Sequence, residues 1–363
     1  MNYASKHTSG CRILEYTHKN SKFVSMENDI LKLVIWVDKG TDIVEIRHKK
    51  SDVDVMWRSP VGIRDLTRQI PTCATARGNN NDYYPGGWHE ALPGGGAYAE
   101  GGNMQGIHGE ATLMPWSFGV IEDTEQSIAA EFYCELVRVP IGVTKRISLT
   151  KGSGAVQFEE RLVNLSRENV SLMWGHHPTY GSPLLGSAAE LTIPAKAFHT
   201  VKNSPLMASP YTLSRFEEDT TYAWPKDMGK DGKTVDLSVF PPSETASAEM
   251  LYLEMNEGWY ALTNREINLG IGIAFDLSVF RCMWYWMNLN GLAGYPWYGS
   301  SYNVGLEFWT SWPNYEEAKK SGTLLQIPAE SEVDTSYSFC IFEPDGRQVS
   351  GINEAGPVYQ PQQ

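Results

Sequence analysis

Short segments in which apolar and charged or polar residues alternate recur along the chain, and this period-two pattern constrains the fold more than any other feature. No helical pattern separates these segments, and 33 Gly and 20 Pro favour turns over long helices. We therefore expect an antiparallel all-β sandwich, with one short helix over residues 315–320. The expected strands cover residues 30–37, 43–46, 53–57, 129–139, 143–149, 155–164, 170–174, 250–253, 259–263, 270–275 and 304–309.

The chain shows no break in composition that would mark a linker between domains. We expect a single β domain over residues 1–345, followed by an extended C-terminal tail over residues 346–363. Residues 79–109 and 201–248 resemble loops, and long loops inside a β domain are usually either functional or poorly ordered.

Charge and cysteine content limit the environment and the partners. The formal net charge is −13, from 43 Asp and Glu against 30 Lys and Arg, so we expect neither nucleic acid nor an anionic membrane as partner. The first residues lack the apolar core of a secretion signal, and the most apolar stretch, residues 267–280, is too short to span a membrane. The five scattered cysteines contain no CxxC pair, which fits free thiols in a cytoplasmic protein.

Several familiar catalytic motifs are missing. The sequence contains no GxxxxGK[ST] phosphate loop, no HExxH pair and no GxSxG elbow. The glycines at 270 and 272 do not form a dinucleotide fingerprint, because Phe275 stands where the third glycine is needed.

Four of the eight histidines lie in segments rich in Gly, Pro and Trp: His89, His108, His176 and His177. Nine glycines fall within residues 86–109, a density that lets backbone approach a ligand closely. A surface loop with incidental histidines is the alternative. A further alternative is a zinc-like metal site built from His89, Glu90, His108 and either His176 or His177, although this spacing matches no known ligand motif.

Glu307 is a lone carboxylate in an apolar strand, and five of the 12 Trp lie between residues 284 and 312. A desolvated glutamate there would have a raised pKa, which suits a general base near neutral pH. The alternative is a strand residue that faces solvent. Aromatic rings beside a carboxylate also suit sugars, because a flat ring covers the C–H face of a pyranose.

Four places in the sequence, in this order, resemble the galactose mutarotase-like superfamily, which includes the aldose 1-epimerases. They are the strand-turn-strand over residues 31–46, the Gly86-Gly87 run to Pro93 with His108-Gly109-Glu110-Ala111, the segment from Asn164 to His176-His177-Pro178, and Gly305-Leu306-Glu307. Together they span roughly residues 25–340.

This resemblance implies a β-supersandwich that binds a small-molecule sugar and interconverts its anomers by opening and closing the ring. It implies Glu307 as general base, His177 as general acid, and His108 as a hydrogen-bonding partner of the ring or an adjacent hydroxyl. His177 is preferred over His176 because it directly precedes Pro178, as in the family's motif. No metal and no organic cofactor are expected for this reaction.

Five further residues are expected to bind the sugar: His176, Trp88, Glu90, Arg77 and Trp286. Arg77 is included because Pro85 stands where many relatives have a sugar-binding arginine, and Phe308 replaces the proline that usually follows the catalytic glutamate. These departures indicate a divergent subfamily. They leave open a carbohydrate-binding protein with weak catalysis, a polysaccharide-processing enzyme on the same scaffold, the identity and phosphorylation of the sugar, and assembly as a homodimer.

Overall fold

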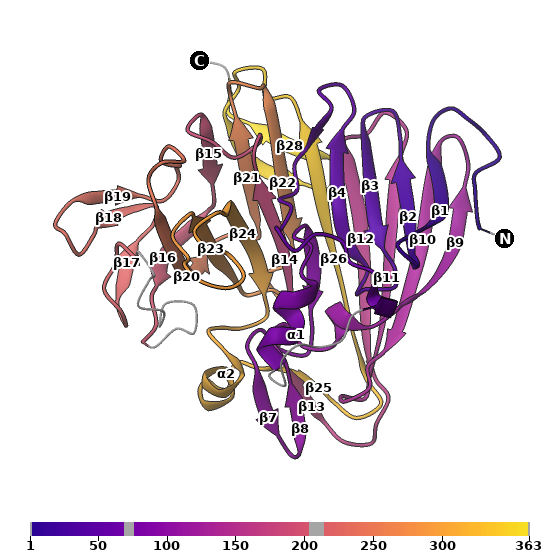
Figure 1. Ribbon diagram of the computed structural model, residues 1–363, viewed down its shortest axis with the longest axis horizontal. Coiled ribbons are helices and arrows are strands. Elements are labelled where there is room, and N and C mark those ends of the chain that lie inside the picture. Colours follow the sequence, from indigo (N-terminus) through magenta and orange to yellow (C-terminus); the bar gives the residue numbers. More distant parts are fainter. Residues whose placement is uncertain (1, 69–75, 203–213, 362–363) are drawn as a thin grey trace.

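Two large antiparallel sheets face each other in the computed structural model, which describes residues 2–68, 76–202 and 214–361 (Figure 1). Twelve strands of the described chain form the larger sheet. Their spatial order is β1 (Arg12–His18), β2 (Ser21–Glu27), β3 (Leu31–Trp36), β4 (Asp42–His48), β6 (Trp88–Ala91), β14 (Gly175–Gly181), β24 (Tyr302–Trp309), β23 (Cys282–Leu289), β20 (Ser247–Met255), β16 (Ala195–His199) and β17 (Thr221–Ala223), with β5 (Val53–Asp54) beside β4.

Eight strands form the smaller sheet within the same described residues. Their order is β15 (Ala189–Thr192), β21 (Trp259–Asn264), β22 (Leu269–Phe275), β26 (Glu332–Phe342), β12 (Ala155–Asn164), β11 (Ile141–Thr150), β10 (Ser127–Glu135) and β9 (Ser117–Asp123). Short hairpins pair β7 (Tyr98–Glu100) with β8 (Asn103–Gln105), β13 (Val170–Leu172) with β25 (Leu325–Ile327), β18 (Lys226–Met228) with β19 (Thr234–Asp236), and β27 (Val349–Asn353) with β28 (Gly356–Tyr359). The helices are α1 (Ala76–Tyr83) and α2 (Tyr315–Ser321), with single 3₁₀ turns at Leu66–Arg68 and Ala111–Leu113.

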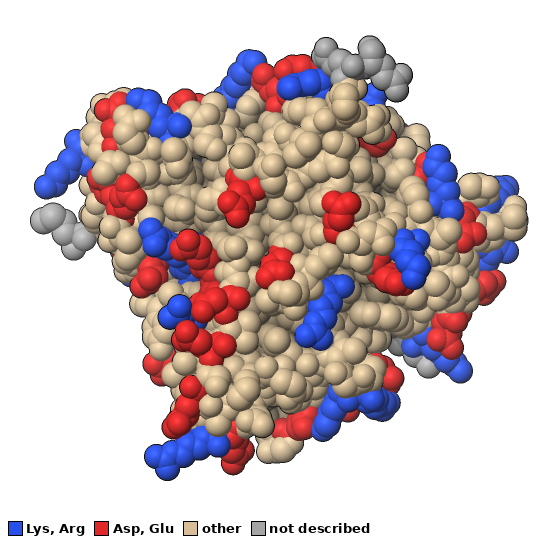
Figure 2. Space-filling model, turned by 180° about the vertical axis from the view of Figure 1, so that it is seen from behind, with Lys and Arg blue, Asp and Glu red and all other residues tan. Residues whose placement is uncertain are grey.

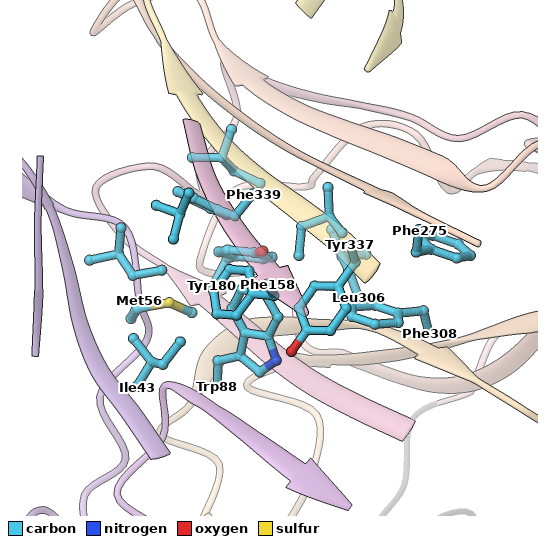
Figure 3. Close-up of a cluster of buried hydrophobic side chains, with 14 of the residues drawn as sticks. Ile43, Met56, Trp88, Phe158, Tyr180, Phe275, Leu306, Phe308, Tyr337 and Phe339 are labelled. Atoms are coloured by element: carbon cyan, nitrogen blue, oxygen red, sulfur yellow. The ribbon is translucent and has the colours of Figure 1, made fainter. Parts of the chain in front are cut away.

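Aromatic side chains from both sheets fill the space between them (Figure 3). Trp88 of the larger sheet contacts Phe158 of the smaller one with ring centroids 5.0 Å apart. Phe308 and Tyr337 meet across the same interface at 5.2 Å. Each such ring buries about 150–250 Å², so the paired aromatic rings are a principal source of the adhesion between the layers.

The expected antiparallel all-β architecture is confirmed, and the helix expected at residues 315–320 is α2. Asn314 caps its first turn through a side-chain oxygen that accepts from the Glu317 N–H, and Gly322 ends it with a φ of 69°. Helix α1 was not expected, because its sequence is rich in Gly and Asn, which are weak helix formers. Asn80 is buried there, so tertiary packing outweighs local propensity.

Parts of both expected loops are ordered as strands. Residues 79–109 include the end of α1 and strands β6, β7 and β8, whereas residues 201–248 include β17, β18 and β19. Residues 203–213 of the second segment lie outside the description.

The C-terminal segment is not the extended tail that was expected from residue 346 onward. Residues 349–359 form the β27–β28 hairpin, which packs against β21, β22 and β26 of the smaller sheet. Val349 and Ile352 are buried there, and the Ile352 Cδ1 lies 2.5 Å from where a Cβ on Gly272 would stand. The hairpin packs here because its apolar side chains are removed from water against the sheet, where Gly272 leaves space for Ile352.

Charge on the surface is mixed in sign. On the face shown in Figure 2, Asp and Glu groups are interspersed with Lys and Arg. No helix among the described residues is long and apolar enough to cross a membrane. Four cysteines (Cys11, Cys134, Cys282 and Cys340) are buried free thiols, and Cys73 lies outside the described residues.

Candidate active site

Three neighbouring strands at the middle of the larger sheet, β6, β14 and β24, carry the central residues of the site. Side chains alternate between the two faces of a strand. His89 of β6 is paired directly with His177 of β14. On the other side of β14, its pairing with β24 places Glu307 beside His177 on the same outer face. His108 reaches this face from the connection that follows β8.

His177 and Glu307 form a buried pair. The His177 Nε2 lies 3.2 Å from the Glu307 Oε1, and the two residues are 4% and 1% exposed. The Trp309 indole N–H donates to the other carboxylate oxygen at 2.8 Å. On the far side of the imidazole, Nδ1 lies 3.0 Å from the Thr179 hydroxyl, which is itself 2.8 Å from the Tyr84 hydroxyl. Hydrogen bonds from Trp309 to Glu307 and between Thr179 and His177 thus hold both reactive groups in place.

Burial changes the proton affinity of both members of this pair. Desolvation raises the pKa of Glu307 to about 8, against the smaller lowering effect of the Trp309 hydrogen bond. Desolvation also lowers the pKa of His177 to about 3. The pair therefore holds one proton between these two values, and it resides on Glu307. The raised pKa expected for a desolvated Glu307 is found, and Glu307 does not face solvent.

His89, His108 and His177, the histidine cluster, pack their rings against one another. The His89 Nε2 lies 2.7 Å from the His108 Nδ1. The His89 and His177 rings are stacked with centroids 4.5 Å apart, and those of His108 and His177 are 5.0 Å apart. Desolvation lowers the pKa of His89 and of His108 well below the ordinary histidine value, so all three rings are neutral near pH 7.

Aromatic side chains enclose the pair and the histidine cluster. Trp286 of β23 lies on the same face, with its ring 5.5 Å from that of His177. Trp57, Tyr84 and Trp297, called here the aromatic cover, lie over Trp286 and His177 with ring separations of 5.3–6.4 Å. Gly305 lies beneath them, and a Cβ there would come within 3.1 Å of the Glu307 Oε1 and 3.4 Å of His177. Its lack of a side chain leaves space beside the reactive pair.

The opposite face of the same strands carries a separate group of buried charges, the inner ion cluster: Glu90, Lys145, Glu160 and His176. The Lys145 Nζ lies 2.7 Å from Glu90 and 3.4 Å from Glu160, and the His176 Nε2 lies 3.0 Å from Glu160. Burial alone would raise the pKa of Glu160, but His176 and Lys145 outweigh it and hold that pKa at about 2. Because β11 and β12 supply two of its members, this cluster links the two sheets.

The structure therefore divides the residues that the sequence singled out. His108, His177, Glu307 and Trp286 lie together on the outer face. Trp88, Glu90 and His176 point between the sheets, where Trp88 packs on Phe158 and donates a long hydrogen bond to His176. Arg77 lies in α1, and its side chain is outside the description. Phe308, the residue after Glu307, belongs to the core (Figure 3).

Several residues of the site were not singled out from the sequence. Thr179 follows His177 by two residues, and Trp309 follows Glu307 by two, so strand alternation could have placed both on the reactive face. Tyr84, Trp57 and Trp297 come from connections between elements. Trp297 is one of the five Trp between residues 284 and 312, but neither it nor the other two was assigned a place in the site.

Within residues 2–68, 76–202 and 214–361, two groups of side chains have donor atoms close enough to hold a metal ion: the histidine cluster, and Glu90, Glu160 and His176. The metal site considered from the sequence mixed residues from both groups. The structure places His89, His108 and His177 on one face of the sheet and Glu90 and His176 on the other.

Comparison with known proteins identifies the fold. A family model described as a domain of unknown function (DUF4432) matches residues 18–341. No curated protein matches the sequence. Among solved structures, a Klebsiella pneumoniae protein named as a candidate aldose 1-epimerase is similar with a TM-score of 0.70 and 15% identity, over 94% of this chain and 87% of its own.

Two other solved structures agree. A galactose mutarotase-like protein from Clostridium acetobutylicum has a TM-score of 0.64 and 13% identity, over 91% of this chain and 98% of its own. One from Lactobacillus casei has a TM-score of 0.58 and 11% identity, over 88% of this chain and 100% of its own. The fold is thus that of the galactose mutarotase-like superfamily.

Proposed function

The chain belongs to the family described as a domain of unknown function (DUF4432), and from its site we propose that it is an isomerase of the aldose 1-epimerase type. The observation that carries this proposal is the buried His177–Glu307 pair, with Nε2 and Oε1 3.2 Å apart. An acid and a base in contact, shielded from water and sharing one proton, suit a reaction that moves one proton off a sugar and another onto it. The names of two structural neighbours, a candidate aldose 1-epimerase and a galactose mutarotase-like protein, support the same choice.

Each group has a defined role in this reaction. The Glu307 carboxylate accepts the proton of the anomeric hydroxyl while His177 donates a proton to the ring oxygen. The bond between the anomeric carbon and the ring oxygen breaks as the anomeric C=O forms. Rotation about the adjacent C–C bond presents the other carbonyl face, and the reverse transfers close the ring. His108 hydrogen-bonds the ring or a neighbouring hydroxyl, and Trp286 offers a flat surface to the C–H face of the sugar.

The resting His177–Glu307 pair holds one proton, which is the number that these two roles require. Between about pH 3 and pH 8 the pair holds one proton, on Glu307. The reactive form has the same single proton on His177 and a free carboxylate on Glu307. Moving the proton across the 3.2 Å contact converts one form into the other without exchange with solvent. The Thr179 hydroxyl on the opposite ring nitrogen stabilises the imidazolium by accepting from Nδ1.

Access to the pair requires displacement of the aromatic cover. His177 and Glu307 are almost completely buried beneath Trp57, Tyr84 and Trp297. Trp297 lies in the connection between β23 and β24, so this segment, at the edge of the site, is the part that we propose moves when the sugar enters. Once closed, the cover excludes water from the opened sugar.

Anomer exchange measured by NMR or polarimetry tests this function. Freshly dissolved α-anomers of several unphosphorylated aldoses, and separately of hexose 6-phosphates, are mixed with the full chain. We expect the wild-type chain to accelerate mutarotation of at least one of them. Glu307→Gln and His177→Ala should each slow it by about 10²–10⁴-fold, as is typical when a positioned acid or base is lost.

A His18→Ala variant serves as the matched control, because His18 is exposed at the end of β1, away from the site. It should retain the wild-type rate. If the wild-type chain accelerates no aldose while it and the two site variants still bind sugar, the protein is a carbohydrate-binding protein and not an isomerase.

A further inference from the structure

His89 has no part in the proposed proton transfers, although it is buried at the centre of the site. It is 1% exposed, and its Nδ1 has no hydrogen-bond partner among the described residues. Its Nε2 lies 2.7 Å from the His108 Nδ1, and one ring nitrogen from each of His89, His108 and His177 lies within 4.8 Å of the other two. Three imidazoles converging without a carboxylate between them need a further explanation.

The three rings are arranged as a metal site needs. A ring nitrogen of each histidine lies within 4.8 Å of those of the other two, and imidazole nitrogen is a common ligand of transition-metal ions. The Nδ1 of His177 lies 3.0 Å from the Thr179 hydroxyl, to which it can donate, and its Nε2 faces the Glu307 Oε1 at 3.2 Å. An outer hydrogen bond such as that to Thr179 is how proteins usually orient a ligating histidine.

Glu307 lies beside the histidine cluster, although it is not one of the residues whose donor atoms all lie within 4.8 Å of one another. Its Oε1 lies 3.2 Å from the His177 Nε2. In a tetrahedral zinc site with bonds of about 2.0–2.1 Å, neighbouring donor atoms are about 3.3 Å apart. The three imidazole nitrogens lie within 4.8 Å of one another, with 2.7 Å between those of His89 and His108, so side-chain adjustments bring these three atoms around one ion and leave the fourth position to water or to Glu307.

The backbone that holds His108 is strained in a way that favours a functional role. His108 has a φ of 64°, in the left-handed region that non-glycine residues rarely occupy. Its N–H donates to the Gly95 carbonyl at 2.9 Å, and its carbonyl accepts from the Leu92 N–H at 3.1 Å. Gly109 follows with a φ of 71°, and a Cβ there would lie 2.2 Å from the Leu92 carbonyl oxygen. Such strain is typical of sites where the backbone holds one side chain in a required orientation.

The other candidate group in the structure is unsuitable for a metal ion. Glu90, Glu160 and His176 already surround the Lys145 ammonium, at 2.7 Å from Glu90 and 3.4 Å from Glu160. A second cation would be repelled by this buried positive charge. A cation that acts on both His89 and His108 is the buried Lys39 ammonium, which is neutralised by its own ion pair with Asp42.

We propose that His89, His108 and His177 form a binding site for one divalent first-row transition-metal ion. Three imidazole nitrogens suit Zn²⁺, Co²⁺ or Ni²⁺ and discriminate against Mg²⁺ and Ca²⁺, which prefer oxygen ligands. Bound metal occupies a ring nitrogen of His177. It therefore blocks the general acid, and this inhibitory consequence rests on the proposed function.

Metal binding is tested on the full chain, after treatment with a chelator and its removal. Co²⁺ is titrated and followed by visible absorption, and Zn²⁺ by calorimetry. We expect one ion per chain, an intense four-coordinate Co²⁺ spectrum that Zn²⁺ abolishes, and no response to Mg²⁺. His89→Ala should weaken Zn²⁺ binding by more than about 100-fold, because loss of a ligand exceeds the 10–100-fold effect of losing a ligand's outer partner.

His18→Ala is again the matched control and should bind metal as the wild type does. If His89→Ala does not fold by circular dichroism, His89→Gln removes the imidazole while it keeps a polar side chain of similar reach. The proposal is overturned if wild-type protein binds no stoichiometric Zn²⁺ or Co²⁺, or if the folded His89 variant binds it as tightly as the control.

The inhibitory step is tested separately by anomer exchange with and without Zn²⁺. One equivalent should abolish the activity, and a chelator should restore it. If metal binds through His89 and anomer exchange continues unchanged, the proposed inhibition is contradicted, whereas the proposed metal site is supported. If no sugar is epimerised by the metal-free chain, the Co²⁺ spectrum still decides the metal site, independently of the proposed function.

Discussion

His176 and His177 are adjacent in the sequence but have unrelated surroundings. His176 contacts Glu160 between the sheets, whereas His177 contacts Glu307 under the aromatic cover. The alternation of side chains along β14 produces this separation. At the scale of single residues, the face to which a side chain points decides whether it belongs to the core or to the candidate active site.

The raised pKa of Glu307 predicts how activity depends on pH. The pair needs one proton, and it loses that proton as the pH rises through about 8, where Glu307 ionises while His177 remains neutral. We expect kcat/KM for anomer exchange to be level near neutral pH and to fall about tenfold per pH unit above 8. A rate that keeps rising above pH 9 would contradict this assignment.

Trp309→Phe provides an internal comparison for this pH profile. The indole N–H hydrogen bond to the Glu307 Oε2 lowers the pKa of that carboxyl. Its removal should raise the pKa, and the fall in kcat/KM should begin at higher pH than in the wild type. A shift to lower pH would mean that another group limits the reaction.

The sequence assigned Glu307 and His177 to one site, and the structure places them in contact. The sequence also assigned Glu90, Trp88 and His176 to sugar binding, and these side chains point between the sheets instead. A resemblance between motifs identifies which segments meet at a site, and it does not by itself state which face each side chain occupies. Strand alternation could have supplied that information once β6 and β14 were recognised as strands. His89 shows the converse case, because its position opposite His177 depends on pairing between segments 88 residues apart.

At the scale of elements, the alternating residues indicated eleven of the strands. Other strands, among them β1, β2, β14, β23 and β26, were not expected, and neither were helix α1 and the β27–β28 hairpin. Helix α1 forms from residues with weak helix propensity. The β27–β28 hairpin forms in a segment with few apolar residues, because Ile352 fits the space that Gly272 leaves. Both depend on contacts with distant residues, which local patterns do not contain.

Ile352→Ala tests whether the C-terminal hairpin contributes to stability. Removing this buried side chain should lower the free energy of unfolding by about 2–5 kcal/mol, the usual cost of truncating a packed isoleucine. Chemical denaturation monitored by tryptophan fluorescence measures the change. Val358→Ala is the matched control, because Val358 is 44% exposed on the partner strand and should change stability little. Equal effects of the two variants would show that the hairpin is not packed as described.

At the scale of the whole molecule, the inner ion cluster and the aromatic core join the two sheets directly behind the candidate active site. Strands β6 and β14 of the larger sheet contribute Glu90 and His176, and β11 and β12 of the smaller sheet contribute Lys145 and Glu160. The order of strands that creates this arrangement could not be predicted from the sequence. Each strand is compatible with many neighbours until the long-range contacts are made.

Lys145→Met tests the contribution of this cluster. The substitution leaves two buried carboxylates without their shared cation, so the free energy of unfolding should fall by about 3–5 kcal/mol. Denaturant unfolding at neutral pH measures it. Arg161→Met removes a cation from an exposed pair with Asp334 on the surface of the smaller sheet, and it should leave the unfolding midpoint unchanged within error. If both variants behave alike, the inner ion cluster does not stabilise the sandwich.

The register between β6 and β14 also links the stability of the molecule to correct assembly of the site. His177 pairs with His89 on one face, and His176 pairs with Glu90 on the other. A chain that paired these strands one residue out of step would turn each side chain to the wrong face. Glu160 would lose its contact with the His176 imidazole. Molecules with this register would then contain incompletely neutralised charges in the buried interior, away from water. Only the pairing that assembles the reactive face also completes the buried network, so molecules with a misbuilt site are selectively unstable.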